Sequence, residues 1–377
     1  MDYKKVIMNS NCSILLRLFA IGLTLVLLSP ILRAEVPADT LVHHPKLSLD
    51  FKSLSFFKNN EYSSPLTRGF TGIGYFVQIG PRLELSEKTS VRAGVHLLQF
   101  SGREKYSEVI PLFAFEHQLH RDWTLIMGSI RGTIDHQLTE PLFRYDRYYR
   151  EPVEYGLRFL LDKEWIQSDI WLNWSEFITE GDPFQEEFYV GKVTRLQILE
   201  REKISLSVPL ELLIYHKGGQ IDSSDDPTIS SYNISAGVST TYPFNDRWTL
   251  SFVPRYYRFF GDERVQTYDR GHAFYLKLKL AHERWDFMVG YWNADQFNAP
   301  GGEHLFLSVS ERPVPFSQKK RELITGKMHY QTSVYEGVEL SSGADFYYDT
   351  MDNSLDFSFR LMVVIDQNFF ISRLKKG

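Results

Sequence analysis

Apolar and polar residues alternate with a period of two along most of the chain beyond residue 45. A clear case is the alternation of Phe274, Leu276, Leu278 and Leu280 with Tyr275, Lys277 and Lys279. Helical spacing would place Lys277 and Leu278 on neighbouring faces, whereas a strand places them on opposite faces. The pattern therefore predicts strands that carry one apolar face and one more polar face.

Sixteen segments show this alternation. They are residues 46–57, 70–85, 89–100, 108–118, 122–131, 151–162, 165–176, 185–199, 203–216, 231–243, 247–259, 271–282, 285–293, 325–335, 337–348 and 355–366. The connections alternate in length, with short turns at 86–88, 119–121, 163–164, 200–202, 244–246, 283–284 and 336, and longer loops at 58–69, 101–107, 132–150, 177–184, 217–230, 260–270, 294–324 and 349–354. Such alternation is typical of bacterial outer-membrane barrels, in which the short turns face the periplasm.

The sequence thus predicts an all-β fold: a transmembrane antiparallel up-and-down β-barrel of about 16 strands with short periplasmic turns and long extracellular loops. Eleven residues that rise about 3.3 Å each and tilt by about 40° cover roughly 28 Å of membrane. This height matches the apolar band of about 25 Å that such barrels present to lipid. Closure is expected because lipid cannot satisfy the hydrogen bonds of an open sheet edge.

Four of the seven tryptophans follow a charged pair directly after a predicted short turn. They are Trp123, Trp165, Trp248 and Trp285. Tryptophan is amphipathic and favours the membrane–water interface, so these residues predict an interfacial girdle at the periplasmic end.

Two other β architectures are less consistent with the pattern. The tryptophans recur at intervals near 40 residues, which is also the period of a propeller blade. A blade needs four strands, however, and each interval here holds two long ones. A secreted β-sandwich would have shorter strands and no need to collect tryptophan at one end.

The N-terminal residues have the features of a secretory signal peptide. Lys4, Lys5 and Arg17 precede an apolar run at 18–28, and Ala34 follows as the expected cleavage point. The run is shorter than the roughly 20 residues that span a bilayer as a helix. The predicted division of the chain is a signal peptide at 1–34, a periplasmic segment at 35–45, the barrel at 46–366 and a C-terminal tail at 367–377.

Composition narrows the classes of site and partner. Cleavage removes Cys12, the single cysteine, and so excludes disulfides, thiolate metal sites and a cysteine nucleophile. Cleavage also removes four basic residues and one acidic residue, which leaves 38 basic against 46 acidic residues. Nucleic acid is not expected as a partner, because binding its phosphates requires a basic surface.

Charged residues opposite the apolar faces are the candidates to line the lumen. They are Arg92, His96, His117, Glu154, Arg158, Glu211, Arg255, Lys277 and Lys279. Inward charges can select solutes in a water-filled pore, or can pair with one another and plug it. The register near Phe113, Phe188 and Leu213 stays open.

Two long loops carry further candidates. In loop 132–150, Arg144, Tyr145, Arg147 and Tyr148 could stack on sugar rings and bind carboxylate or phosphate, or could belong to an outer aromatic belt. Loop 294–324, with the apolar run 305–307, could fold into the pore or cap the barrel from outside.

No enzyme or metal motif is found. The chain has no G-x-S-x-G elbow, no H-E-x-x-H pair and no phosphate-binding glycine loop. The acidic turn at 181–187 does not match an EF-hand. We therefore expect no enzymatic activity, no cofactor and no metal. An outer-membrane lipid hydrolase, the remaining alternative, would need a serine and a histidine that meet on the outer barrel wall.

The strand plan resembles outer-membrane β-barrel proteins of Gram-negative bacteria. The tyrosine-rich hairpin from Tyr335-Glu336-Gly337-Val338-Glu339-Leu340 to Asp345-Phe346-Tyr347-Tyr348 is similar to uncharacterised porin-like barrels of the Bacteroidota. Many such barrels end on an aromatic residue, whereas Phe369-Phe370 is followed here by seven residues, so the insertion signal would be internal.

The leading hypothesis is a porin-like channel in the outer membrane for passive passage of small polar solutes. Outer-membrane lipid is the expected environment, and a homo-oligomer is compatible with it. The alternative is a closed barrel that serves as a scaffold or subunit of a surface or secretion complex. An outer-membrane lipid-acting enzyme ranks third.

Overall fold

The computed structural model describes residues 45–219, 221–262, 265–313 and 315–374, so the predicted signal peptide and most of the segment 35–45 lie outside the described residues. The strands are β1 (Lys46–Glu61), β2 (Thr71–Ser86), β3 (Thr89–Phe100), β4 (Glu108–His120), β5 (Trp123–Ser129), β6 (Tyr155–Lys163), β7 (Ile166–Glu176), β8 (Glu187–Arg201), β9 (Ile204–Lys217), β10 (Ile229–Gly237), β11 (Ser239–Pro243), β12 (Trp248–Phe260), β13 (Arg270–His282), β14 (Trp285–Asp295), β15 (Lys320–Tyr335), β16 (Val338–Asp349) and β17 (Ser354–Arg373). Three short helices, η2 (Thr133–His136), α2 (Arg147–Arg150) and η3 (His304–Phe306), lie in the loops.

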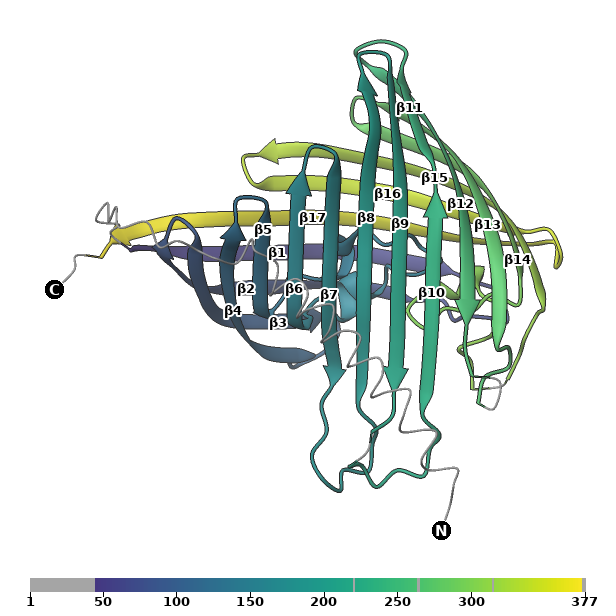
Figure 1. Ribbon diagram of the computed structural model, residues 1–377, viewed down its shortest axis with the longest axis horizontal. Helices are drawn as coiled ribbons and strands as arrows, with labels where there is room; N and C mark the ends of the chain where they lie inside the picture. The colour runs from purple at the N-terminus through teal and green to yellow at the C-terminus, as the bar shows by residue number, and fades with distance from the viewer. Residues whose placement is uncertain (1–44, 220, 263–264, 314, 375–377) are drawn as a thin grey trace.

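The strands form one closed antiparallel barrel (Figure 1). Each strand pairs with its neighbours in sequence, and β1 closes the ring by pairing with both β2 and β17. Strands β10 and β11 are two parts of one barrel strand, because both pair with β9 and β12. The barrel therefore has the predicted sixteen strand positions. Pro254 on β12 explains the interruption at Val238, since proline has no N–H to donate to the ladder.

The last strand is longer than predicted. It was expected to end at residue 366 and to be followed by a tail, but β17 continues to Arg373. Phe369 and Phe370 pair with Leu49 and Ser48 at the start of β1. The polar stretch Asp366-Gln367-Asn368 hides the alternation in the sequence, because its side chains lie at the wet periplasmic end.

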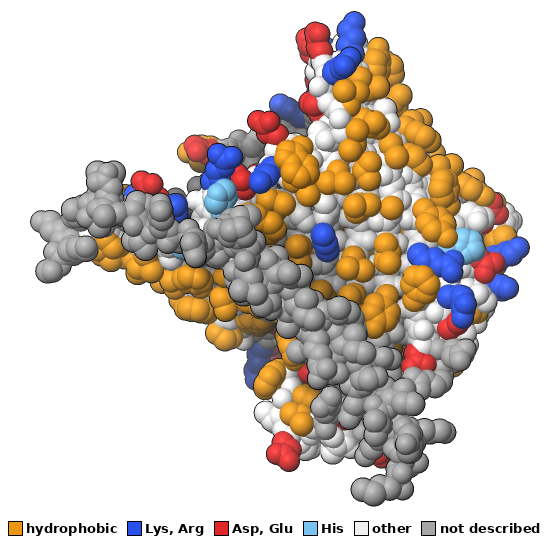
Figure 2. Space-filling model, viewed as in Figure 1, with side chains coloured by type: hydrophobic (Ala, Val, Ile, Leu, Met, Phe, Trp, Pro, Cys, Tyr) orange, Lys and Arg blue, Asp and Glu red, His pale blue; other side chains and the backbone are white. Residues whose placement is uncertain are grey.

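The two faces of the wall differ as the alternation predicts. Large apolar side chains are exposed on the outside, and Figure 2 shows them spread over the outer wall with charged groups mostly near its rims. Phe113 faces outward and is 57% exposed, whereas Leu213 is buried inside. Among the described residues, no helix is long and apolar enough to cross a membrane.

Loops 130–154 and 294–319 fold into the barrel, and we call them together the plug. Leu142, Phe143, Phe297 and Phe306 of the plug are buried among inward side chains of the wall, which include Ile126, Trp171, Leu213, Tyr257, Tyr275, Trp292, Leu323 and Tyr347. Tyr148 and Tyr149 pack against β1, β2 and β3 in a second cluster. Of the two fates considered for loop 294–324, the structure shows inward folding.

The two loops of the plug are joined by backbone hydrogen bonds. The N–H of Arg144 donates to the carbonyl of Gly301 at 2.8 Å, and the N–H of Glu303 donates to the carbonyl of Glu140 at 2.8 Å. A Cβ at position 302 would collide with the carbonyl oxygen of Pro141, so this close approach requires Gly302.

A buried ionic network fastens the plug to the wall. Nδ1 of His136 lies 2.7 Å from Asp169, and Nε2 lies 2.9 Å from Glu154. Both carboxylates accept, so both ring nitrogens donate and the ring is an imidazolium. The ring stacks on Trp171 with centroids 3.6 Å apart, and Arg158 holds Asp169 through two hydrogen bonds.

The charge on His136 should make the stability of the plug depend on pH. Burial lowers the pKa of His136, but the bonds and charges of Asp169 and Glu154 outweigh burial and raise this pKa above its usual value. A folded-state pKa above the unfolded value gives a stabilisation that is complete below about pH 6.5 and is lost as the pH rises through the raised value. The melting temperature in detergent should therefore fall from about pH 6 to about pH 9.

The variant His136→Phe tests this origin, because its ring can still stack on Trp171 while the charge is lost. We expect the free energy of unfolding to fall by about 3–5 kcal/mol near pH 6, since two buried carboxylates lose their partner. The melting temperature should then depend less on pH. Parallel profiles for the variant and the unchanged protein would contradict the assignment.

Candidate functional site

The predicted lumen residues lie on two sides of the barrel interior. Arg92 and Glu154 line a pocket of about 300 Å³ beside β1–β4. His96 is fully buried next to Gln78, and Arg158 belongs to the network around His136. Arg255, Lys277 and Lys279 line a larger cavity on the opposite side, and Glu211 pairs with Arg255 at 2.9 Å.

His117 was expected to line the lumen with these residues and does not. It has the same strand parity as Phe113, which faces outward on β4. Its Nδ1 lies 2.8 Å from Oγ1 of Thr89 at the periplasmic end of the wall. The register near Phe113 decides this placement, because a shift by one residue exchanges the two faces of a strand.

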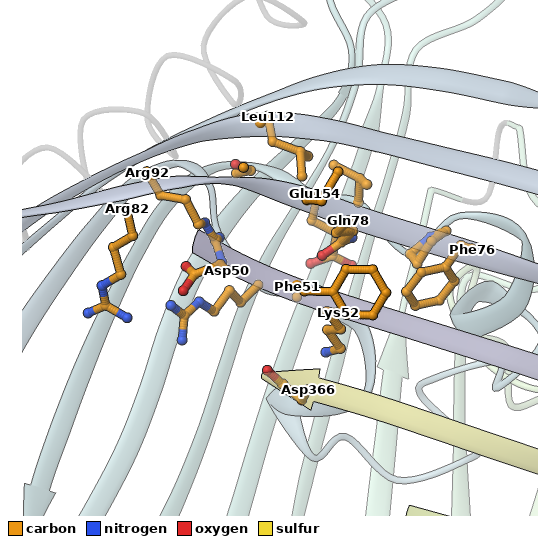
Figure 3. A pocket seen from close by; sticks show the side chains of 18 of the residues that line it. Asp50, Phe51, Lys52, Phe76, Gln78, Arg82, Arg92, Leu112, Glu154 and Asp366 are labelled. Atoms are coloured by element: carbon orange, nitrogen blue, oxygen red, sulfur yellow. The ribbon is translucent and has the colours of Figure 1, made fainter. Parts of the chain in front are cut away.

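The smaller pocket has a mixed electrostatic lining. Figure 3 shows Arg92 reaching toward Asp50, and Lys52 pointing toward Asp366. Arg82 and Arg92 come from adjacent strands and lie opposite one another in the register. The acids and bases of this pocket are close to balanced.

The larger cavity measures about 730 Å³, and we call it the lumen cavity. Thr139, Glu140, Tyr145, Asp146 and Glu303 of the plug form its roof at the extracellular side. Exposure increases toward the other end of the cavity, where Arg195, Lys279 and Asp286 are exposed. The lumen cavity is therefore closed by the plug above and open toward the periplasmic turns.

The roof contains a carboxyl group that is held neutral. Burial, followed by the negative charge of Asp146, raises the pKa of Glu303 to about 8. Asp146 itself accepts a hydrogen bond from Asn60 at 3.1 Å, and Glu140 pairs with Lys327. At neutral pH, Glu303 thus presents a protonated carboxyl to the cavity.

The four predicted loop residues all belong to the plug. Arg144 pairs with Glu311 at 2.7 Å, and Arg147 lies over the ring of Tyr189 and near Glu151 and Glu154. Tyr148 is buried against Phe76. Tyr145 faces the lumen cavity. Recognition of a solute by these residues stays a prediction.

The four tryptophans of the predicted girdle lie together at the short-turn end of the barrel. Trp123, Trp248 and Trp285 begin β5, β12 and β14, and Trp165 directly precedes β7. Trp165 is 60% exposed. Trp248 stacks on His282 with centroids 4.0 Å apart. Contact of these rings with lipid stays a prediction.

A serine and a histidine meet on the outer wall near the extracellular end. His216 on β9 and Ser230 on β10 face each other in the register, and Oγ of Ser230 lies 2.9 Å from Nδ1 of His216. Their neighbours Tyr215 and Ser231 point inward, so the pair points outward. Ser230 is half-buried.

The surroundings of this pair select one tautomer of the histidine. Nε2 of His216 lies 3.1 Å from the carbonyl oxygen of Gly218, which can only accept, so Nε2 carries the proton. In the neutral ring, Nδ1 is then the acceptor and the hydroxyl of Ser230 donates to it. Gly218 has a φ of 137°, and a Cβ there would lie 2.6 Å from Oγ1 of Thr228. Only glycine can adopt this backbone conformation here, and the conformation directs the carbonyl of Gly218 toward Nε2 of His216.

Aromatic rings lie beside the serine–histidine pair. The ring of Phe188 packs on His216 with centroids 4.9 Å apart, and Trp174 packs on Phe188 at 5.3 Å. Phe177 beyond them is 71% exposed. The wall therefore offers an apolar surface next to a polar pair.

Sequence reasoning stated the need for such a pair but did not find it. His216 and Ser230 lie at the two ends of loop 217–230, and only the register between β9 and β10 brings them together. The alternation along each strand could have indicated the pair. His216 lies two residues from Ile214 and Ser230 two residues from Tyr232, and Ile214 and Tyr232 both face outward.

Comparisons with known proteins give a family and a fold. A family model described as "Lipid A 3'-O-deacylase-type" matches residues 38–374. No curated protein matches the chain. The family match contradicts the expectation that the chain has no enzymatic activity, because a deacylase is an enzyme.

Solved outer-membrane proteins share the fold at low identity. OprD of Pseudomonas aeruginosa is 11% identical, with a TM-score of 0.50 over 86% of this chain and 94% of that one. OpdK of the same organism is 11% identical, with a TM-score of 0.51 over 86% of this chain and 99% of that one. A loop-deletion mutant of OmpT from Vibrio cholerae is 9% identical, with a TM-score of 0.51 over 86% of this chain and 100% of that one. These likenesses show the fold of an outer-membrane β-barrel.

The protonated state of Glu303 can be tested by substitution. Its raised pKa gives a stabilisation that is complete below about pH 4.5 and is lost as the pH rises through about 8. Glu303→Gln resembles the protonated carboxyl in both the folded and the unfolded state, so the variant should melt like the unchanged protein near pH 4.5 and several degrees higher near pH 9. A variant that is less stable at both pH values would contradict the prediction.

Proposed function

The chain belongs to the lipid A 3'-O-deacylase-type family, and from that premise we propose that it hydrolyses an ester-linked acyl chain of lipid A in the outer leaflet of the outer membrane. The observation that carries the proposal is the pair Ser230–His216 on the outer wall. A nucleophile that acts on membrane lipid must be reached from the outer side of the wall, and this pair lies on that side, with Ser230 half-buried and His216 buried beneath Phe188.

The pair has the arrangement of an activated nucleophile. A hydroxyl is a weak nucleophile until a base within hydrogen-bond reach takes its proton, and here the distance is 2.9 Å. The carbonyl of Gly218 orients the imidazole in the tautomer that leaves Nδ1 as the base. This is the role that a third group has in serine hydrolases.

The reaction can be written from these groups alone. Oγ of Ser230 attacks the ester carbonyl while Nδ1 of His216 takes the hydroxyl proton. The bond between the carbonyl carbon and the sugar oxygen breaks, and His216 returns the proton to that oxygen. Water then gives a proton to His216 and attacks the acyl carbon. The bond from this carbon to Oγ of Ser230 breaks, His216 returns the proton to Oγ, and the fatty acid leaves.

The height of the pair in the membrane fits an ester substrate. His216 is the penultimate residue of β9 and Ser230 is the second of β10, so both lie where the strands leave the membrane. Ester groups of lipids lie at this boundary, with acyl chains below. The rings of Phe188 and Trp174 are placed to pack against such chains.

The proposal predicts that activity is lost when either residue of the Ser230–His216 pair is replaced. Ser230→Ala and His216→Gln should each lower fatty-acid release from lipid A in detergent micelles by at least about a thousandfold, since nucleophile and base act as a unit. Release is measured by mass spectrometry of the lipid.

The control is the double variant Thr89→Ala, His117→Gln. It removes a second outward hydroxyl–histidine pair, with 2.8 Å between Oγ1 and Nδ1, at the periplasmic end of the wall. It should retain full activity. Unchanged activity of the Ser230 and His216 variants, with the barrel folded, would rule out this site.

A second candidate function is passage of small polar solutes, and the lumen cavity favours it. The cavity is polar, measures about 730 Å³ and extends from the plug toward the periplasmic turns. The plug is the barrier that a solute would have to pass.

Planar-bilayer recordings test this second candidate. A channel selective through Lys277 and Lys279 should show single-channel steps, and Lys277→Glu with Lys279→Glu should shift the reversal potential in a salt gradient toward cation selectivity. A folded protein that gives no steps would exclude passage.

A further inference from the structure

We propose that one side of the lumen cavity binds a small oxyanion with two or more negative charges, of the phosphate or polycarboxylate type, that enters from the periplasmic end. The site is formed by Arg195, Arg255, Lys277 and Lys279, and we call it the basic wall. It lies on the inward faces of β8, β12 and β13.

The basic wall has more cations than acids to neutralise them. Glu211 accepts from the N–H and the hydroxyl of Thr139 and pairs with Arg255 at 2.9 Å, and Asp286 lines the exposed end of the cavity near Lys279. No carboxylate among the described residues lies within ion-pair distance of Arg195, Lys277 or Lys279. Three basic side chains thus face one cavity without an ion-pair partner.

One of these groups has a buried donor atom without a hydrogen-bond partner, and another is buried against an aromatic ring. Lys277 is 8% exposed, and its ammonium contacts the ring of Tyr275 at 4.9 Å. Nε of Arg255 is buried and has no hydrogen-bond partner in the part of the chain that the structure describes. A buried donor atom without an acceptor is unfavourable, and an anion bound beside it would supply the missing acceptor.

The cavity beside the cations is kept open by small side chains. Ser207 and Pro209 on β9 and Ser239 and Thr241 on β11 line it between Arg195 and Lys277. None of these residues can reach across the lumen to fill the space. The hydroxyl groups of Ser207, Ser239 and Thr241 can also donate hydrogen bonds to an oxyanion.

The opposite side of the lumen cavity is different, which explains why an anion would select the basic wall. There Lys327 pairs with Glu140 and Asp345, and Arg360 pairs with Asp345 at 3.1 Å. Lys58 donates to Ser358 at 2.9 Å close to the same acids. Cations on that side are neutralised by the protein itself.

The proposed anion site and the proposed hydrolase site are independent. Glu211 and Tyr215 of β9 point into the barrel, whereas His216 lies on the outer side of the wall. Loss of anion binding would therefore leave hydrolysis by Ser230 intact, and loss of hydrolysis would leave anion binding intact.

The test is calorimetric titration of the detergent-purified full chain with inorganic pyrophosphate at constant ionic strength. We expect saturable binding of one pyrophosphate per barrel. The double variant Lys277→Gln, Lys279→Gln should weaken it by at least about tenfold, since two charge-assisted contacts are lost. Chloride at the same ionic strength should not compete.

The matched control is Lys46→Gln, Lys163→Gln, which removes two lysines outside the lumen cavity and should change affinity by less than about twofold. If the first double variant fails to fold, Ser239→Phe fills the cavity without altering charge and should abolish binding. A folded protein that does not bind pyrophosphate, or that binds it equally in all variants, would overturn the proposal.

Discussion

The need to pair every backbone N–H and C=O in lipid is the constraint on which the structure depends. A sheet meets it only when the last strand returns to the first, and β1 pairs with β17 along its whole length. Even the break caused by Pro254 is repaired locally, because its carbonyl accepts from the N–H of Val238 at 3.1 Å. Once the ring is closed, the period of two along each strand creates one surface for lipid and one for the lumen.

A ring of this size encloses more space than its own inward side chains can fill. The plug supplies the missing packing at the extracellular half, where Phe297 and Phe306 lie among Tyr257, Tyr275 and Trp292. Its polar groups must then be paired inside the barrel, and His136 between two carboxylates is the clearest result. Among the described residues, no loop fills the periplasmic half in this way, and there the basic wall lines the lumen.

The strands could be predicted from the sequence because alternation is a local property of the side chains. The end of β17 was missed where Asp366, Gln367 and Asn368 break the apolar pattern at the wet rim. The fate of the long loops could not be predicted, because a loop has no periodicity that says whether it faces solvent or lumen. The Ser230–His216 pair needed the register of two strands across loop 217–230, and a slip of one residue would reverse the facing of either side chain.

The two proposed sites lie on opposite sides of one wall. On β9, Tyr215 faces the lumen and His216 lies on the outer side, although the two residues are adjacent. The wall between them is one strand thick, so neither water nor ions need to cross it for either site to be occupied. A hydrolase that faces lipid gains from a rigid wall, because the 2.9 Å contact of Ser230 and His216 is set by ladder hydrogen bonds rather than by a mobile loop. The plug contributes to that rigidity from inside, since Leu213 of β9 is buried against it. The filled lumen is in this view a support for the outer site as well as a barrier.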